Sequence, residues 1–345
     1  DARYKGNVLI IPCPFVLDRQ SGFLKKVYYH IQGILFLLGI KKDKTMYDQM
    51  KSCDFIIFNG GNLLRSATLT DFVRLKALNY PLEIGRKLGK DYYIFPQSSS
   101  TIKGYGEVVI REMLERAKTV FTREKLTYNA LRHKFDLGNL VQTIDLAFFI
   151  DKGPLSAPQV GNERKIAFTF RAHSVGDLYE LSRHEKDKIS TYILNFISEL
   201  NADDEIFFVV QTRKDLMFTT QLQRKVETQT TRRIKIFENY DPVALIRFYA
   251  SIDLLVGMRL HSIILAISAG VPCYGLFYSQ WGLKNPGVMT RFNLPFKVLD
   301  ENSVPDRVAD EVSLCYSLIA NKQDFEATAR GIIDSEVSKF KAVLK

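Results

Sequence analysis

Short apolar runs alternate along the chain with longer stretches in which apolar residues recur every three or four positions. The runs are typical of buried strands and the stretches of amphipathic helices. In the first half, the predicted strands are residues 7–12, 54–58, 91–95 and 119–122, and residues 142–149 close the series. The predicted helices are residues 22–38, 68–88, 107–117 and 124–134, with a break or new start at Pro81. This alternation predicts βαβ units and a parallel sheet.

The same alternation restarts after residues 151–164, which contain two Gly and two Pro and no apolar period, as in a linker. The predicted strands there are residues 165–170, 205–211, 233–237, 252–256 and 273–277. The predicted helices are residues 184–200, 216–227, 242–250, 259–269, 305–320 and 324–345. We therefore predict an α/β fold with two Rossmann-like lobes, residues 1–150 and 165–322, facing each other across a cleft. A final helix, 323–345, is expected to pack back on the N-terminal lobe.

The net charge of +10 comes from 48 basic and 38 acidic residues in a chain of 345. A basic chain suits an anionic substrate, an anionic membrane or a nucleic acid. Since it contains no nucleic-acid motif and no run of five Lys or Arg, we expect a solvated basic surface and no nucleic-acid partner. The four cysteines lack CxxC spacing, which argues against zinc and against a disulfide framework.

Several nucleotide-binding and metal-binding signatures are missing from the sequence. It has no GxxxxGK[ST] loop, no GxGxxG after a strand and no Asp-x-Asp in a loop after a strand. These absences argue against a P-loop hydrolase, a dinucleotide oxidoreductase and a metal-bound nucleotide sugar. No metal is expected. The chain starts at Asp1 without Met, and the apolar residues 31–40 are too few to span a bilayer, so we expect any membrane anchor in a removed upstream segment.

The most informative segment is residues 256–272, VGMRLHSIILAISAGVP. Arg259 and His261 follow a buried strand at the point where a helix begins, a place where α/β sheets bind anions. Arg171 directly follows another predicted strand, and an arginine there can hold a carboxylate or phosphate with two parallel hydrogen bonds. His261 could transfer a proton near neutral pH. The alternatives are that Arg171 only caps the sheet edge and that His261 is a structural histidine.

Other polar or glycine-containing clusters lie at predicted strand ends. The candidates among them are Asn59, Gly60, Gln97, Ser98, Asp145 and Tyr278. A tight turn explains Gly60 about as well as close approach of a ligand, and Gln97 with Ser98 could merely cap a helix. Asp145 is either paired structurally or a base. Tyr278, with Trp281, could stack on a sugar or pack in the core.

Taken in order, these clusters resemble the polysaccharide pyruvyl transferase family over most of the chain. The residues that carry the resemblance are Asn59-Gly60-Gly61-Asn62, Pro96-Gln97-Ser98, Thr122-Arg123-Glu124, Asp145-Leu146-Ala147-Phe148, Phe168-Thr169-Phe170-Arg171 and Gly257-Met258-Arg259-Leu260-His261 through Gly270-Val271-Pro272. The last of these, G-x-R-x-H…A-x-x-x-G-x-P, is the most specific.

The resemblance implies a glycosyltransferase-B type fold and transfer of the enolpyruvyl group of phosphoenolpyruvate to a sugar, giving a cyclic 4,6-type ketal and phosphate without a metal. It implies that the donor is bound in the C-terminal lobe by Arg171, Arg259, Leu260, His261 and Ser262, with the first two and His261 catalytic. His261 is either the general acid/base or the group that protonates the departing phosphate. Acceptor contacts are expected from Asn59, Gly60, Gln97, Ser98, Asp145 and Tyr278.

The start of the chain departs from the bacterial pattern of the family. Pro12-Cys13-Pro14 stands where a Gly-Asn-x-Gly-Asp turn is usual. This departure resembles eukaryotic luminal members and implies a type II protein of the Golgi lumen that acts on terminal galactose of a glycan; a cytoplasmic bacterial enzyme is the alternative. Two other functions are open: a nucleotide-sugar-dependent glycosyltransferase of the same fold, and a non-catalytic carbohydrate- or anion-binding protein.

Overall fold

The structure is a computed structural model that describes residues 23–41, 43–150, 163–173, 180–282, 284–299 and 308–344. The chain divides into two compact units, Asp1–Thr143 (unit 1) and Ile144–Lys345 (unit 2). The division therefore falls before the predicted linker, and residues 144–150 belong to unit 2. The predicted strand at 7–12 and residues 151–162 lie outside the described residues. The cleft between the lobes stays a prediction.

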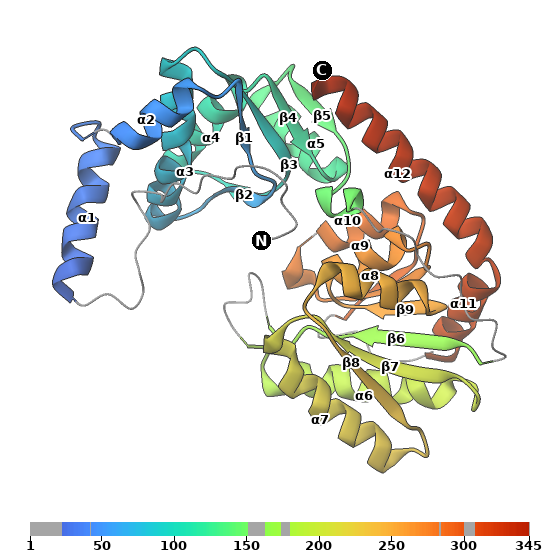
Figure 1. Ribbon diagram of the computed structural model, residues 1–345. Coiled ribbons are helices and arrows are strands. Elements are labelled where there is room, and N and C mark those ends of the chain that lie inside the picture. The colour runs from blue at the N-terminus through green and yellow to red at the C-terminus, as the bar shows by residue number, and fades with distance from the viewer. Residues whose placement is uncertain are drawn as a thin grey trace. The chain divides into compact units, whose positions relative to one another are not determined.

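Unit 1 contains a five-stranded sheet in which every described pair of strands is parallel (Figure 1). Its strands are β1 (Phe55–Phe58), β2 (Gly61–Ser66), β3 (Asp91–Ile102), β4 (Thr119–Thr122) and β5 (Leu140–Gln142). Its helices are α1 (Phe23–Leu37), α2 (Lys44–Lys51), α3 (Leu69–Lys87), α4 (Tyr105–Glu115) and α5 (Lys125–Phe135). Most of them match the predicted elements within a few residues, whereas α2 and β2 have no predicted counterpart.

The central strand of unit 1, β3, is longer than predicted because it continues through Pro96. Residues Asp91–Ile94 pair with β1, and the part from Gln97 onward pairs with β2. Pro96 lies between these parts, where the register with β4 shifts. Proline is tolerated at such an irregularity because a ladder hydrogen bond is already missing there. Gln97 and Ser98 therefore lie within a strand and not in a loop after one.

Two other predictions in unit 1 and at its end are wrong. Helix α3 is a single helix that contains Pro81, with no break. Its neighbours Tyr80, Leu82 and Ile84 are buried, so tertiary packing outweighs the lost backbone hydrogen bond. Residues 142–149 do not form one element: β5 ends at Gln142, and Leu146–Phe149 is the 3₁₀-helix η1.

Unit 2 is a doubly wound sheet of six parallel strands in the order β11-β10-β9-β6-β7-β8. The strands are β6 (Lys165–Thr169), β7 (Glu205–Val210), β8 (Ile234–Glu238), β9 (Leu254–Gly257), β10 (Cys273–Phe277) and β11 (Phe296–Val298). The helices are α6 (Arg183–Glu199), α7 (Arg213–Gln229), α8 (Pro242–Ala250), α9 (Leu260–Ser268), α10 (Lys284–Arg291), α11 (Val308–Ala320) and α12 (Lys322–Leu344), with the 3₁₀-helix η3 at Ser279–Trp281.

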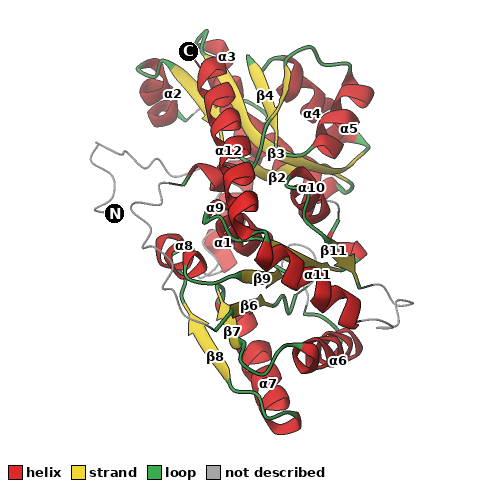
Figure 2. Ribbon diagram, turned by 90° about the vertical axis from the view of Figure 1, so that its right-hand side faces the viewer, coloured by secondary structure: helices red, strands yellow, loops and turns green. Residues whose placement is uncertain are grey.

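Helices cover both faces of this sheet. Figure 1 shows α6 and α7 on one face and α8 and α9 on the other, and Figure 2 separates these helices from the strands by colour. Burial on both faces explains why β6, β9 and β10 are continuous apolar runs rather than alternating ones. The strand order reverses between β6 and β9, and in open α/β sheets ligands bind outside the carboxyl ends of the strands at that point.

The last helix contributes to the core of unit 2. Ala329 and Ile333 of α12 belong to its buried cluster, and Phe340 packs edge-on against Phe149 of η1 at 5.4 Å between ring centroids. The predicted packing of residues 323–345 on the N-terminal lobe stays a prediction. Helix α10 and strand β11 have no predicted counterpart.

Candidate active site

Two arginines lie at the strand-order reversal of unit 2. Strands β6 and β9 are neighbours, and Thr169 is the register partner of Gly257. The N–H of Met258 extends this ladder by donating to the carbonyl of Thr169 at 3.1 Å. Arg171 and Arg259 each come two residues after this pair, so both follow adjacent strands at the carboxyl edge of the sheet. Both arginines were predicted to follow a strand, and the register explains why their positions are equivalent.

The turn that carries Arg259 requires a glycine before it. A Cβ built on Gly257 would lie 2.7 Å from Cγ1 of Ile263, a residue of the first turns of α9. The missing side chain thus lets α9 begin directly over the end of β9. Arg259 is the N-cap residue of α9 and caps it with no side-chain hydrogen bond. Since the first N–H groups of a helix have no partner within it, those of Leu260, His261 and Ser262 form an anion-attracting end.

Arg259 forms a buried ion pair with Asp215, a residue that the sequence analysis did not single out. Arg259 Nε lies 2.5 Å from Asp215 Oδ2, and its Nη2 lies 2.8 Å from Oδ1. The two residues are 9% and 2% exposed. Asp215 is in the first turn of α7, and acidic residues are common in the first turn of any helix. Its position in the sequence therefore did not indicate a role in the site.

Arg171 is also buried and lies over an aromatic ring. Its Cζ is 4.7 Å from the centroid of the Trp281 indole, a cation–π contact that fixes where the guanidinium lies. Tyr278 packs edge-on against Trp281 at 5.3 Å, and its hydroxyl donates to the carbonyl of Glu185 at 3.1 Å. Burial raises the pKa of the Tyr278 phenol, which therefore stays neutral. Tyr278 supports the Trp281 ring, and its predicted sugar contact stays a prediction.

The other donor-side candidates differ in exposure. His261 is exposed on the first turn of α9, so its imidazole can reach solvent or a ligand. Leu260 is half-buried. Ser262 is fully buried, and its hydroxyl faces the phenol of Tyr249, where it opposes the rise in pKa that burial causes. Ser262 can therefore meet a ligand only through its backbone N–H.

The acceptor-side candidates of unit 1 lie just after β1 and in the middle of β3. Gln97 is fully buried; its Nε2 donates to the carbonyl of Asn59 at 2.5 Å, and its Oε1 accepts from the N–H of Leu63 at 3.3 Å. A Cβ on Gly60 would lie 2.8 Å from the carbonyl oxygen of Pro96, so this glycine makes room for β3. Asn59 is exposed, with Oδ1 accepting from the N–H of Gly60 at 2.8 Å. Gln97 thus holds the turn that presents Asn59.

Ser98 belongs to a buried polar network next to this turn. Its hydroxyl donates to Glu124 Oε2 at 3.1 Å and accepts from Nε of Arg123. Thr127 donates to the other oxygen of Glu124 at 2.6 Å. Ser98 therefore joins β3 to the start of α5, and the helix that it helps to place is α5 rather than the next helix along the chain.

Asp145 lies in unit 2, apart in the chain from the other acceptor-side candidates. Its Oδ1 accepts from the N–H of Ala147 at 3.0 Å and caps η1. Asp145 as a residue is 8% exposed. Of the two interpretations of Asp145, this contact supports the structural one, and its role as an acceptor contact stays a prediction.

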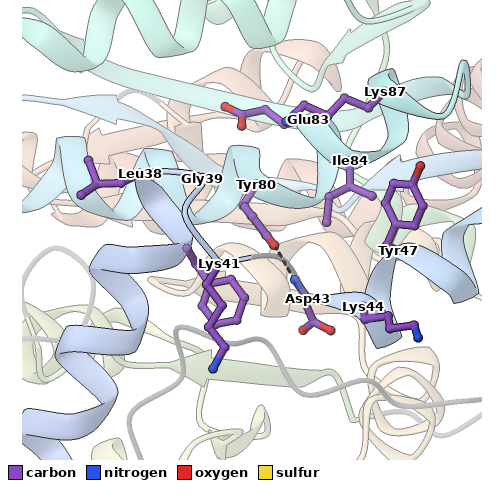
Figure 3. Close-up of a pocket in the computed structure, with 11 residues that line it drawn as sticks. Leu38, Gly39, Lys41, Asp43, Lys44, Tyr47, Tyr80, Glu83, Ile84 and Lys87 are labelled. Carbon is purple, nitrogen blue, oxygen red and sulfur yellow. Dashed lines mark hydrogen bonds between the residues drawn. The ribbon is translucent and has the colours of Figure 1, made fainter.

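A cavity of about 550 Å³ opens in unit 1 between α1, α2 and α3. Lys41, Lys44 and Lys87 line it together with Tyr47 and Tyr80, as Figure 3 shows. The Tyr80 hydroxyl accepts from the N–H of Asp43 at 3.1 Å and so ties α3 to the start of α2. None of the predicted site residues lines this cavity.

The described part of the chain shows neither a cluster of metal ligands nor a membrane-spanning helix. Within it, no three His, Cys, Asp or Glu side chains gather as a metal site would require. No helix in the same ranges is long and apolar enough to cross a bilayer. The metal-free reaction stays a prediction.

The two parallel sheets and the arginine-bearing edge at a strand-order reversal define an α/β protein with two Rossmann-like units, of the glycosyltransferase-B type. A model of one family, polysaccharide pyruvyl transferase, matches residues 2–280. The chain therefore belongs to the polysaccharide pyruvyl transferase family. A search of the curated proteins found no match.

Solved structures with the same fold include a galactosyltransferase, a protein bound to UDP and a protein described as an epimerase. The lipopolysaccharide outer core galactosyltransferase WaaB in its apo form has a TM-score of 0.53 and 10% identity, covering 91% of this chain and 80% of that one. Anabaena Alr3699/HepE in complex with UDP also has a TM-score of 0.53, with 12% identity. The match covers 86% of this chain and 81% of that one. A Listeria monocytogenes protein described as a UDP-N-acetylglucosamine 2-epimerase has a TM-score of 0.53 and 14% identity. The match covers 91% of this chain and 76% of that one. These likenesses show the fold alone.

Proposed function

We propose that this chain transfers the pyruvyl group of phosphoenolpyruvate to a terminal galactose or related sugar of a glycan, forming a 4,6-type ketal and releasing phosphate. The observation that carries the proposal is the placement of Arg171 and Arg259 two residues beyond the register pair Thr169–Gly257, beside the start of α9. Phosphoenolpyruvate has a phosphate and a carboxylate, so a site for it needs two anion-binding groups on one surface.

In this proposal, the phosphate binds at the first turn of α9, where the helix N–H groups and the Arg259 guanidinium both favour negative charge. Arg171, held over Trp281, binds the carboxylate. Arg259 is paired with Asp215, and the start of α9 beside it adds partial positive charge that favours an anion.

The reaction needs two net proton transfers and stabilisation of the departing phosphate. The donor methylene gains a proton and becomes a methyl group, one sugar hydroxyl adds to the adjacent carbon, and a second hydroxyl displaces phosphate. One of the two hydroxyl protons replaces the proton given to the methylene, and the other leaves with the phosphate. His261, exposed at the start of α9, is the general acid/base in this scheme, and the arginines stabilise the departing anion.

For the acceptor we propose unit 1, with Asn59 as an exposed contact. Gly60, Gln97 and Ser98 act by shaping the turn, because Gln97 and Ser98 are buried and hydrogen-bonded within the unit. We propose the Golgi lumen as the place where this reaction occurs, with the cytoplasm as the alternative, because Pro12-Cys13-Pro14 departs from the bacterial pattern of the family.

The test is incubation of the purified protein with phosphoenolpyruvate and a panel of galactosides. We expect phosphate release in step with a mass gain of one pyruvate ketal on the sugar, at an unchanged rate in EDTA. Parallel reactions with nucleotide sugars test the glycosyltransferase alternative. Sugar transfer from a nucleotide donor without pyruvate transfer overturns the proposal, and binding of the donor with no transfer to any sugar supports a non-catalytic protein instead.

A further inference from the structure

One acidic side chain connects the two strand ends that carry the arginines. Asp215 Oδ1 accepts from the backbone N–H of Ala172 at 3.0 Å and from Arg259 Nη2 at 2.8 Å. Ala172 is the residue after Arg171, so a single carboxylate oxygen contacts both the end of β6 and the arginine that follows β9. The other oxygen, Oδ2, contacts Arg259 Nε at 2.5 Å.

The position of Asp215 is itself fixed by α7. Thr212 is the N-cap residue of this helix, and its carbonyl accepts from the N–H of Asp215 at 3.1 Å. A carboxylate in the first turn of a helix interacts favourably with the helix dipole. Strands β6, β7 and β9 and helix α7 therefore all bear on where the Arg259 guanidinium lies.

Burying such a pair is not needed for stability. The desolvation of two charges offsets much of their attraction, and apolar side chains of similar volume commonly stabilise a core as well or better. A bidentate pair does something that apolar packing does not: it sets the plane and direction of the guanidinium. That direction matters only if Arg259 must meet a ligand.

We propose that Asp215 is a positioning residue for the reaction, which holds Arg259 and the Arg171 end of β6 in the relative placement that grips the donor. The inference rests on the proposed function, since the donor is taken to be phosphoenolpyruvate. Asp215 touches no substrate in this scheme; it acts through Arg259.

The experiment compares Asp215→Asn with wild type in steady-state transfer assays. Asparagine retains an oxygen that can accept from the Ala172 N–H but loses the ion pair with Arg259. We expect the KM for phosphoenolpyruvate to rise about 10- to 100-fold, as small misplacements of binding groups do, while the KM for the galactoside changes little. Asp215→Glu keeps the charge, moves it by one methylene and is expected to fall in between.

The matched control is Asp253→Asn. Asp253 accepts from the N–H of Lys165 at 2.9 Å and pairs with Lys322 at 2.9 Å, so it also joins β6 to a cation, but at the amino edge of the sheet. Its replacement is expected to lower the melting temperature and leave the donor KM unchanged. A purely structural role for Asp215 predicts the same behaviour for Asp215→Asn.

A double-mutant cycle with Arg259→Met decides whether Asp215 acts through Arg259. If it does, adding Asp215→Asn to Arg259→Met lowers kcat/KM little further. Fully additive losses, or an unchanged donor KM in a folded Asp215→Asn variant, overturn the inference while leaving the proposed function standing. Absence of phosphoenolpyruvate-dependent transfer in the wild type overturns the proposed function and the inference with it. Should Asp215→Asn fail to fold, the Asp215→Glu variant and its cycle with Arg259→Lys give the same decision.

Discussion

Arg259 and His261 are two residues apart at the start of α9, yet their environments are opposite. Arg259 is buried and ion-paired with Asp215, whereas His261 is exposed. Removing the arginine side chain leaves the Asp215 carboxylate buried without its charge partner, which is costly. Removing the imidazole leaves no cavity in the core. The two residues of one motif therefore differ in what their loss does to the fold.

We expect His261→Ala to lower kcat by about 100-fold or more, because a positioned proton-transfer group contributes on that order. Its free energy of unfolding should change by no more than about 0.5 kcal/mol, as is usual at exposed positions. Transfer assays and urea unfolding measure the two effects. For comparison, Arg259→Ala should lose activity and about 3–5 kcal/mol of stability. Full activity of the His261→Ala protein would exclude the proton-transfer role.

The residues of the site were predictable from sequence where they follow a buried strand directly. Arg171 and Arg259 stand out because a charged residue interrupts an apolar pattern there. Asp215 does not, because an acidic residue in a first helical turn has an ordinary explanation as a helix-stabilising charge. The hydrogen bonds of Gln97 and Ser98 could likewise not be predicted from sequence. Their partners Asn59 and Glu124 are set by how β1, β3 and α5 pack together.

At the scale of elements, the junction of β9 and α9 depends on Gly257. We expect Gly257→Ala to cost about 1–3 kcal/mol, because the new methyl group would lie 2.7 Å from Ile263 Cγ1 and must displace α9 or Ile263. Transfer activity should fall with it, since α9 carries Arg259 and His261. Urea unfolding measures the cost.

Gly331→Ala serves as the control for this substitution. Gly331 is inside α12, and a Cβ there meets nothing within 4 Å. Alanine at this position should stabilise the protein by up to about 1 kcal/mol through its helix propensity. Equal effects of the two substitutions would show that the α9 contact is not what makes Gly257 necessary.

Elements with a long, clean pattern were predictable, and those shaped by neighbours were not. The apolar runs of β6, β9 and β10 are typical of strands in a sheet covered on both faces. By contrast, β2 begins at Gly61 within a polar Asn-Gly-Gly-Asn turn and gains its strand geometry by pairing with the far part of β3. That pairing exists because β3 continues past Pro96, which no local pattern indicates.

At the scale of the whole molecule, the buried clusters of the described residues are separate. The large cluster runs from Ile144 to Ile333, and the other two lie between Phe36 and Leu140. Each cluster thus belongs to one unit.

We therefore expect a fragment of residues 144–345 to fold by itself and to melt cooperatively in circular dichroism. A fragment of residues 165–322, which follows the boundaries predicted from sequence, should not. It lacks Ile144, Phe148, Ala329 and Ile333, four side chains of the large cluster. Burial of that many apolar groups is worth several kcal/mol, comparable to the stability of a whole domain. Cooperative melting of the shorter fragment, or none in the longer one, would contradict the division at Thr143.

None of these clusters spans the division, so each half has a core of its own among the described residues. The two halves can accordingly diverge at different rates. Under the proposed roles, unit 1 can be remodelled for a new glycan while unit 2 keeps the donor site, and chimeras joined near Thr143 are a direct route to new acceptor preferences.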